Sequence, residues 1–150
     1  MPPSLAPIDR MVDLIAEDVH DERVLQAMRD VPRHEFVPAP ARPRAYDDVA
    51  LAIGSRQTIS QPVIVALMTA ALALRGGEHV LEVGTGSGYQ AAVLARIAAT
   101  VVTVERIDAL RERAEETLRR LGITNVRCLP AAISRDAPDA ARAPLGAPAE

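Results

Sequence analysis

The sequence contains an acidic residue followed by three closely spaced glycines, a pattern suited to holding a ligand. Glu82 precedes Gly84, Gly86 and Gly88. Glycine adopts positive φ readily, and its lack of a Cβ allows a ligand to approach the backbone. Such a turn between a strand and a helix lies at the carboxyl edge of an open α/β sheet, where these folds bind ligands. The pattern predicts a nucleotide-like cofactor at this turn.

The spacing and the local charge favour one cofactor class. The dinucleotide fingerprint G-x-G-x-x-G would need glycine where Tyr89 stands, so NAD is disfavoured. S-adenosylmethionine carries a sulfonium cation and no pyrophosphate, so its site should favour acids. Glu82 flanks the turn, and residues 84–95 contain no Arg or Lys. The electrostatics therefore favour S-adenosylmethionine, with Thr85 and Ser87 completing the predicted binding segment.

A second acidic residue, Glu105, ends the next β-branched segment. It lies about 20 residues beyond Gly84, where an acid in such folds accepts hydrogen bonds from ribose hydroxyls. The alternative is a solvated strand end beside Arg106. The spacing favours the ribose interpretation, because one carboxylate can accept from two hydroxyls.

The elements that must position these residues alternate between strand and helix. Short apolar or β-branched runs predict strands at residues 79–83, 100–104 and 124–128, the first of them buried. Helical patterns cover residues 62–75, 89–99 and 108–121. Strands alternating with helices indicate a parallel sheet of βαβ units, so the predicted fold class is α/β.

The segment ahead of the first strand is polar and rich in hydroxyl groups. It spans residues 53–62 and leads into a helix. On spacing alone, Ser60 is interpreted as an N-cap, since serine is favoured there and Pro62 suits the first turn. Further upstream, two short helices are predicted, the second capped by Asp21. Residues 33–55 form an irregular, proline-rich arm, ordered if its two aromatic residues dock.

Composition narrows the function classes. The chain has 150 residues, a net charge of −3, 17 basic residues that are all Arg, and three aromatic residues. A basic nucleic-acid face and a stacking platform for bases are therefore not indicated. The lone Cys128 excludes an intrachain disulfide and a zinc site of several thiolates, and predicts a reducing, cytoplasmic compartment. No run reaches the roughly 20 apolar residues of a membrane span.

Several motifs together resemble the protein-L-isoaspartate O-methyltransferase family, which repairs abnormal isoaspartyl residues. The similarity extends over about residues 11–128. The Thr-Ile-Ser-x-Pro motif at residues 58–62, together with the Arg-His-x-Phe-Val-Pro motif at residues 33–38, is specific to this family. The matching segments are residues 21–25, 31–38, 45–46, 57–62 and 80–92.

The resemblance implies a Rossmann-like S-adenosylmethionine-dependent methyltransferase fold, of which the chain holds the N-terminal helices and the first three parallel strands. It implies that Ser60 is the active-site serine and that residues 57–60 close over the cofactor. Substrates would be isoaspartyl-containing proteins or peptides, and a monomer without membrane or nucleic-acid partners is expected. The residues implied in cofactor binding are Gln57, Thr58, Ile59, Ser60, Glu82, Gly84, Thr85, Gly86, Ser87, Gly88 and Glu105.

The pattern departs from the family after the third strand. Residues 1–128 are the expected methyltransferase part, and residues 129–150 form an Ala- and Pro-rich tail where the family has a Gly-Asp-Gly turn. We expect a truncated chain in which residues 79–83 keep one unpaired edge. The alternatives are a non-catalytic remnant, a dinucleotide-binding Rossmann module, or a methyltransferase acting on RNA or a small molecule.

Overall fold

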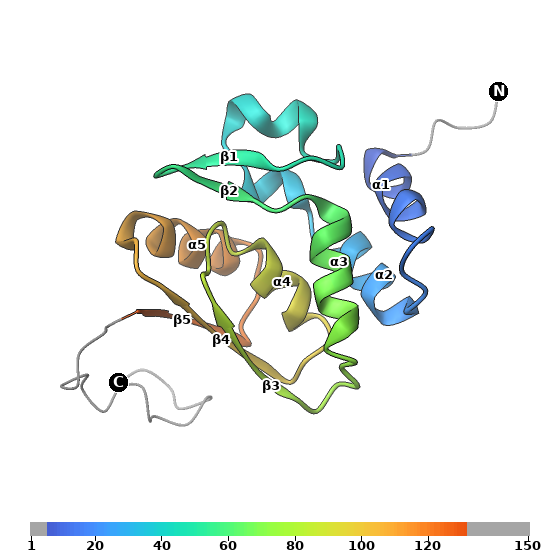
Figure 1. The fold of residues 1–150 in the computed structure, drawn as a ribbon. Coiled ribbons are helices and arrows are strands. Elements are labelled where there is room, and N and C mark those ends of the chain that lie inside the picture. Colours follow the sequence, from blue (N-terminus) through green and yellow to red (C-terminus); the bar gives the residue numbers. More distant parts are fainter. Residues whose placement is uncertain (1–5, 132–150) are drawn as a thin grey trace.

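A three-stranded parallel sheet forms the base of the molecule. The structure is a computed structural model that describes residues 6–131. Strand order in this sheet is β3 (His79–Val83), β4 (Thr100–Glu105) and β5 (Val126–Pro130). Helices α4 (Tyr89–Ala95) and α5 (Asp108–Arg120) connect the strands and pack on the sheet (Figure 1). The predicted α/β class and parallel sheet are confirmed.

The two faces of the sheet differ in burial. Side chains alternate along a strand, so Val101, Thr103 and Glu105 share one face of β4 and are buried. On β3, Leu81 and Val83 point the other way and are 66% and 80% exposed. The prediction that residues 79–83 form a buried strand is therefore wrong, because no element within residues 6–131 covers that face. The predicted unpaired edge of this strand is present in the described sheet.

Three helices form a second layer beside α4. They are α1 (Pro7–Ile15), α2 (Glu22–Asp30) and α3 (Pro62–Ala71), and they contact one another (Figure 1). Asp21 caps α2 as predicted, with its carboxylate accepting from the Arg23 N–H at 2.9 Å. No helix in the described part of the chain is long and apolar enough to cross a membrane.

The arm is more regular than predicted. It contains two 3₁₀ helices, η1 (Arg33–Phe36) and η2 (Ala39–Arg44), and strand β1 (Leu51–Gly54), which pairs with β2 (Gln57–Ile59) in an antiparallel hairpin. The prediction of an irregular arm is wrong for this hairpin. Both strands are short and their turn is atypical, with Ser55 and Arg56 at φ of 51° and 58°. Because the turn lacks the usual Asn-Gly or Asp-Gly pair, the sequence carries no hairpin signal.

Both aromatic residues of the arm dock. Phe36 is 5% exposed and meets the ring of Tyr89 edge-on at 5.6 Å between centroids. Tyr46 is half-buried, and its hydroxyl lies 2.7 Å from Nδ1 of His34. The sequence predicts an ordered arm if Phe36 and Tyr46 dock, and both do.

Several boundaries differ from the predicted ones. Helix α3 ends at Ala71 instead of near residue 76, and α4 ends at Ala95 instead of residue 99. Strand β5 is shifted by two residues, so it includes Leu129 and Pro130 from the predicted tail. The remainder of that tail, residues 132–150, lies outside the described residues.

Candidate cofactor site

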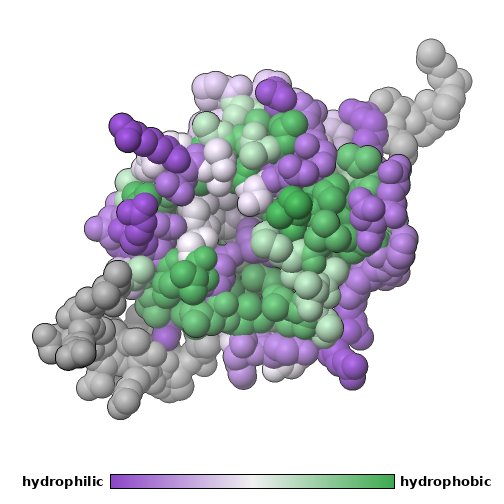
Figure 2. Space-filling view, viewed as in Figure 1, coloured by the Kyte–Doolittle hydropathy of each residue, from purple (hydrophilic) through white to green (hydrophobic). Residues whose placement is uncertain are grey.

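A cleft of about 420 Å³ opens at the carboxyl end of β3. Segment 58–60 and α3 form one wall, and the turn after β3 with α4 forms the other. Figure 2 shows apolar surface over α3 and along the sheet, on two sides of the hollow. The apolar lining residues are Ile59, Val65, Met68, Leu72, Val80, Leu81, Val83 and Leu94. This volume falls within the range of small-molecule sites.

The structure brings most of the predicted cofactor residues to this one cleft. Those that line it are Thr58, Ile59, Ser60, Glu82, Gly84, Thr85, Gly86 and Ser87. Gln57, Gly88 and Glu105 do not line it. Gly88 has a packing role instead, since a Cβ there would lie 3.0 Å from the Cβ of Ala114 on α5.

The glycine loop, residues 84–88, depends on backbone conformations that favour glycine. Gly84, Gly86 and Gly88 have φ of 94°, 55° and 86°. A Cβ built on Gly86 would lie 3.8 Å from Cδ1 of Ile53 in the hairpin. Side chains larger than glycine are therefore disfavoured mainly by backbone strain.

Three consecutive N–H groups of the glycine loop are engaged by β4. Those of Gly84 and Thr85 donate to the carbonyl of Val104, at 2.8 and 3.1 Å. The N–H of Gly86 donates to Oε2 of Glu105 at 2.9 Å. These donors therefore point into the protein instead of forming a cradle for a phosphate group.

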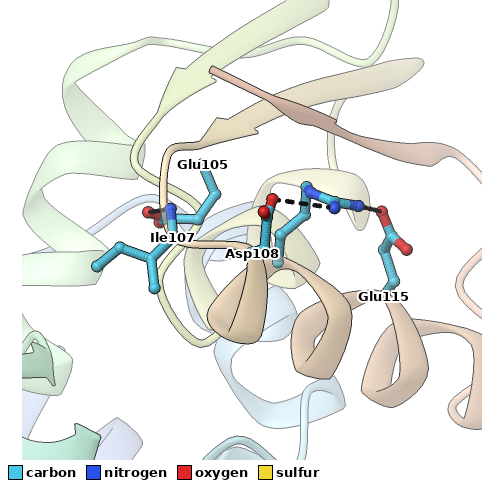
Figure 3. Close-up of polar contacts among 5 residues, drawn as sticks. Glu105, Ile107, Asp108 and Glu115 are labelled. Atoms are coloured by element: carbon cyan, nitrogen blue, oxygen red, sulfur yellow. Dashed lines mark hydrogen bonds and ion pairs between the residues drawn. The ribbon is translucent and has the colours of Figure 1, made fainter. Parts of the chain in front are cut away.

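Glu105 fastens the glycine loop to the start of the following helix. Its Oε1 accepts from the N–H of Ile107 at 3.0 Å, as Figure 3 shows, and the residue is only 6% exposed. The alternative of a solvated strand end is therefore wrong. A carboxylate offers about four acceptor positions, so two remain beyond these bonds. The contact with ribose hydroxyls stays a prediction.

Among residues 6–131, Glu82 is the only acidic residue that lines the cleft, and it is linked to two threonines. The hydroxyl of Thr103 donates to Oε1 of Glu82 at 2.6 Å and lies 2.7 Å from the Thr85 hydroxyl. Burial raises the pKa of Glu82 to about 7, against the lowering effect of the Thr103 bond and with a smaller raising effect from Glu105. Glu82 therefore titrates near neutral pH.

Ser60 is exposed at the edge of the cleft and does not cap α3. The N-cap residue is Gln61, and its own side chain makes no capping hydrogen bond. Asp48 takes the capping role from the arm, because its Oδ1 accepts from the N–H of Val63 at 2.9 Å and its Oδ2 accepts from Nε2 of Gln61 at 3.2 Å. The N-cap interpretation of Ser60 is therefore wrong, and capping does not occupy its hydroxyl.

Sequence reasoning missed Gln90 and the wall formed by α3. Gln90 lines the cleft, and its Nε2 donates to the Thr69 hydroxyl at 2.8 Å. The sequence predicts a helix at α3, but the apolar stripe of a helix indicates a core face and a ligand wall alike. Its position next to the cofactor strand in the sequence is the one signal that could have suggested the wall.

The histidines and the cysteine lie apart from the cleft. His34 contacts Tyr46, and Nδ1 of His79 lies 2.6 Å from the Thr100 hydroxyl. Cys128 is half-buried. Burial raises the pKa of its thiol to about 11, which leaves it protonated at neutral pH.

Comparison with known proteins gives one consistent family. The sequence model described as protein-L-isoaspartate(D-aspartate) O-methyltransferase matches residues 9–133. A protein-L-isoaspartate O-methyltransferase of Syntrophobacter fumaroxidans is 55% identical over 120 residues, which are 79% of this chain and 56% of that protein. One from Nitrosococcus oceani is 58% identical over 112 residues, 75% of this chain and 51% of that protein. The chain thus spans about half the length of the curated relatives it matches.

Solved structures agree with the fold. A structure described as protein-L-isoaspartate O-methyltransferase superposes with a TM-score of 0.75 at 30% identity, covering 81% of this chain and 41% of the other. A Plasmodium falciparum structure in complex with S-adenosyl-L-homocysteine has a TM-score of 0.70 at 24% identity, covering 81% and 62%. The three-stranded sheet with its helices is therefore part of a Rossmann-like methyltransferase fold.

Proposed function

The chain belongs to the protein-L-isoaspartate(D-aspartate) O-methyltransferase family, and on that premise we propose that its cleft binds S-adenosylmethionine. We further propose that the site directs methyl transfer to the free carboxylate of L-isoaspartyl residues in damaged proteins and peptides. Cytoplasmic location, a monomeric state and the absence of nucleic-acid and membrane partners remain predictions of the sequence.

The observation that carries the choice of cofactor is the direction of the glycine-loop N–H groups. A dinucleotide site presents such donors to a pyrophosphate. Here three consecutive donors, from residues 84–86, are bonded to β4. No Arg lines the cleft in the described part of the chain, whereas the acidic Glu82 does. An acidic cleft without a phosphate cradle suits a cationic sulfonium, and it argues against the dinucleotide-binding alternative.

The residues of the chain have separate tasks in this proposal. S-adenosylmethionine, when bound, supplies an electrophilic methyl group. The backbone of the glycine loop and the acids Glu82 and Glu105 would hold it, and the hydroxyl of Ser60 would orient the acceptor carboxylate. A side-chain carboxylate with a pKa near 4 is ionised at pH 7, so the site needs no general base. Alignment of the two reactants then supplies most of the acceleration, on the order of several kcal/mol.

Methyl transfer to a defined peptide tests this function. The chain is incubated with methyl-labelled S-adenosylmethionine and a peptide containing one L-isoaspartyl residue, and in parallel with the same peptide containing aspartate. We expect label only in the isoaspartyl peptide, released by mild base as a methyl ester would be. Binding of S-adenosylmethionine without any transfer would favour the non-catalytic remnant. Binding of NAD alone would contradict the choice of cofactor.

A further inference from the structure

Arg33 is a fully buried cation that lies outside the cleft. It begins η1 in the arm and has 0% of its surface exposed. A buried charge is costly unless hydrogen bonds compensate for the lost water. Its Nε donates to the carbonyl of Ala45 at 2.8 Å, and its Nη2 donates to the carbonyl of Ser60 at 2.8 Å. The guanidinium therefore donates hydrogen bonds to main-chain carbonyls from two distant parts of the chain.

The same guanidinium also contacts the opposite wall of the cleft. Its Cζ lies 4.9 Å from the ring centroid of Tyr89, within the range of a cation–π interaction. Tyr89 directly follows the glycine loop, is 1% exposed and lines the cleft. Arg33 therefore touches the residue that follows the cofactor loop and the main chain of Ser60 at once.

We infer that Arg33 is a positioning residue that fixes Ser60 relative to the glycine loop. This inference rests on the proposed function, in which Ser60 orients the acceptor carboxylate. Two features make the link selective. The planar fork of arginine directs its donors in fixed directions, which a lysine ammonium does not reproduce. The acceptor on the serine segment is the main-chain carbonyl of Ser60 itself, so a loss of this bond acts at that residue first.

The test compares Arg33→Lys with Arg113→Lys. Arg113 is the control for loss of an arginine bond to the main chain, because its Nη1 donates to the carbonyl of Ile53 at 3.0 Å in the hairpin that precedes Ser60. Misplacement of a reacting group by about 1 Å costs about 100-fold in rate. We expect Arg33→Lys to lower kcat for the isoaspartyl peptide about 10- to 100-fold, with the Kd for S-adenosylmethionine within about twofold. We expect Arg113→Lys to change neither value by more than about twofold.

Two readouts separate positioning from general stability. In Arg33→Lys, amide hydrogen exchange of segment 57–61 should accelerate relative to Arg113→Lys, while exchange in α5 stays unchanged. Equal kcat and equal exchange in the two variants would overturn the inference. If Arg33→Lys does not fold, the inference is tested with the guanidinium ¹⁵N spectrum of the unaltered chain. Separate, slowly exchanging Nη signals for Arg33 would show a guanidinium fixed by its bonds and support the inference. Averaged Nη signals would show free rotation and overturn the inference.

The outcome for Arg33 can be told apart from the outcome for the function. If the unaltered chain binds no S-adenosylmethionine, the proposed function fails. The exchange of segment 57–61 and the guanidinium signals still report whether Arg33 holds Ser60. If S-adenosylmethionine binds and methyl transfer occurs, but the two lysine variants behave alike, only the role of Arg33 fails.

Discussion

The two walls of the cleft are fixed in different ways. The glycine loop is held by the neighbouring strand, through the carbonyl of Val104 and the carboxylate of Glu105. The serine segment, residues 57–60, is short and largely exposed. Its residues 57–59 pair with β1, the carbonyl of Ser60 accepts from Arg33, and Asp48 of the arm holds the start of α3 that follows. The glycine loop makes its turn through its own glycines at positive φ, whereas the serine segment follows the pairing of β2 with β1 and contacts from side chains of the arm. Substitutions in the two walls should therefore have different effects.

The largest effect is expected in the glycine loop. Gly86→Val should weaken binding of S-adenosylmethionine about 100-fold or more, because a β-branched residue is strained at a φ of 55°. Isothermal titration calorimetry measures the loss. Gly77→Val is the matched control, since a Cβ there meets nothing within 4 Å and its φ is not positive. Unchanged affinity in a folded Gly86→Val chain would show that the glycine loop does not contact the cofactor.

A different pattern is expected at Ser60. Ser60→Ala should lower kcat about tenfold, because the acceptor carboxylate loses a hydrogen bond. Its Kd for S-adenosylmethionine should stay within about twofold, and its Tm should not change, since capping of α3 does not use this hydroxyl. Steady-state methyl transfer and thermal unfolding measure these values. A folded variant with the turnover of the parent would refute the role of Ser60.

The arm should stabilise α3 through its carboxylate. Asp48→Ala removes the acceptor for the N–H of Val63, and loss of such a cap costs about 1 kcal/mol of unfolding free energy. Asp47→Ala is the control, because Asp47 is exposed and pairs with Arg44 at the surface, and the carboxylate that accepts from the N–H of Val63 belongs to Asp48. Urea unfolding should give a lower midpoint for Asp48→Ala than for Asp47→Ala. Equal midpoints would mean that Asp48 does not cap the helix.

The smallest effect concerns pH. The pKa of Glu82 is raised to about 7, so the carboxylate is mostly protonated at pH 6 and mostly ionised at pH 8. A cation binds the ionised form better, so affinity for S-adenosylmethionine should rise about threefold over this range. S-adenosylhomocysteine has a neutral sulfur and should show a smaller rise. In Glu82→Gln, affinity should change with pH by the same factor for both ligands. If S-adenosylmethionine still showed the larger rise, Glu82 would be excluded as its source.

The same contrast explains what could be read from the sequence. Strand β3 and the start of α3 were predicted at their observed residues, and the glycine loop was placed correctly, because apolar runs and glycine spacing are local signals. The hairpin was missed, since its turn uses Ser55 and Arg56 at positive φ. The contributions of Arg33 and Asp48 were also missed. Their contacts depend on how the arm folds back, and no periodic pattern encodes such tertiary contacts.

Mapping the bound cofactor tests the central claim most directly. A ¹⁵N-labelled chain is titrated with S-adenosylmethionine, and amide chemical shifts are followed residue by residue. We predict that the largest changes fall on residues 58–60 and 82–90, the two walls of the cleft. Changes gathered away from this cleft, for example on α1 and η2, or no changes at a saturating concentration, would contradict the account.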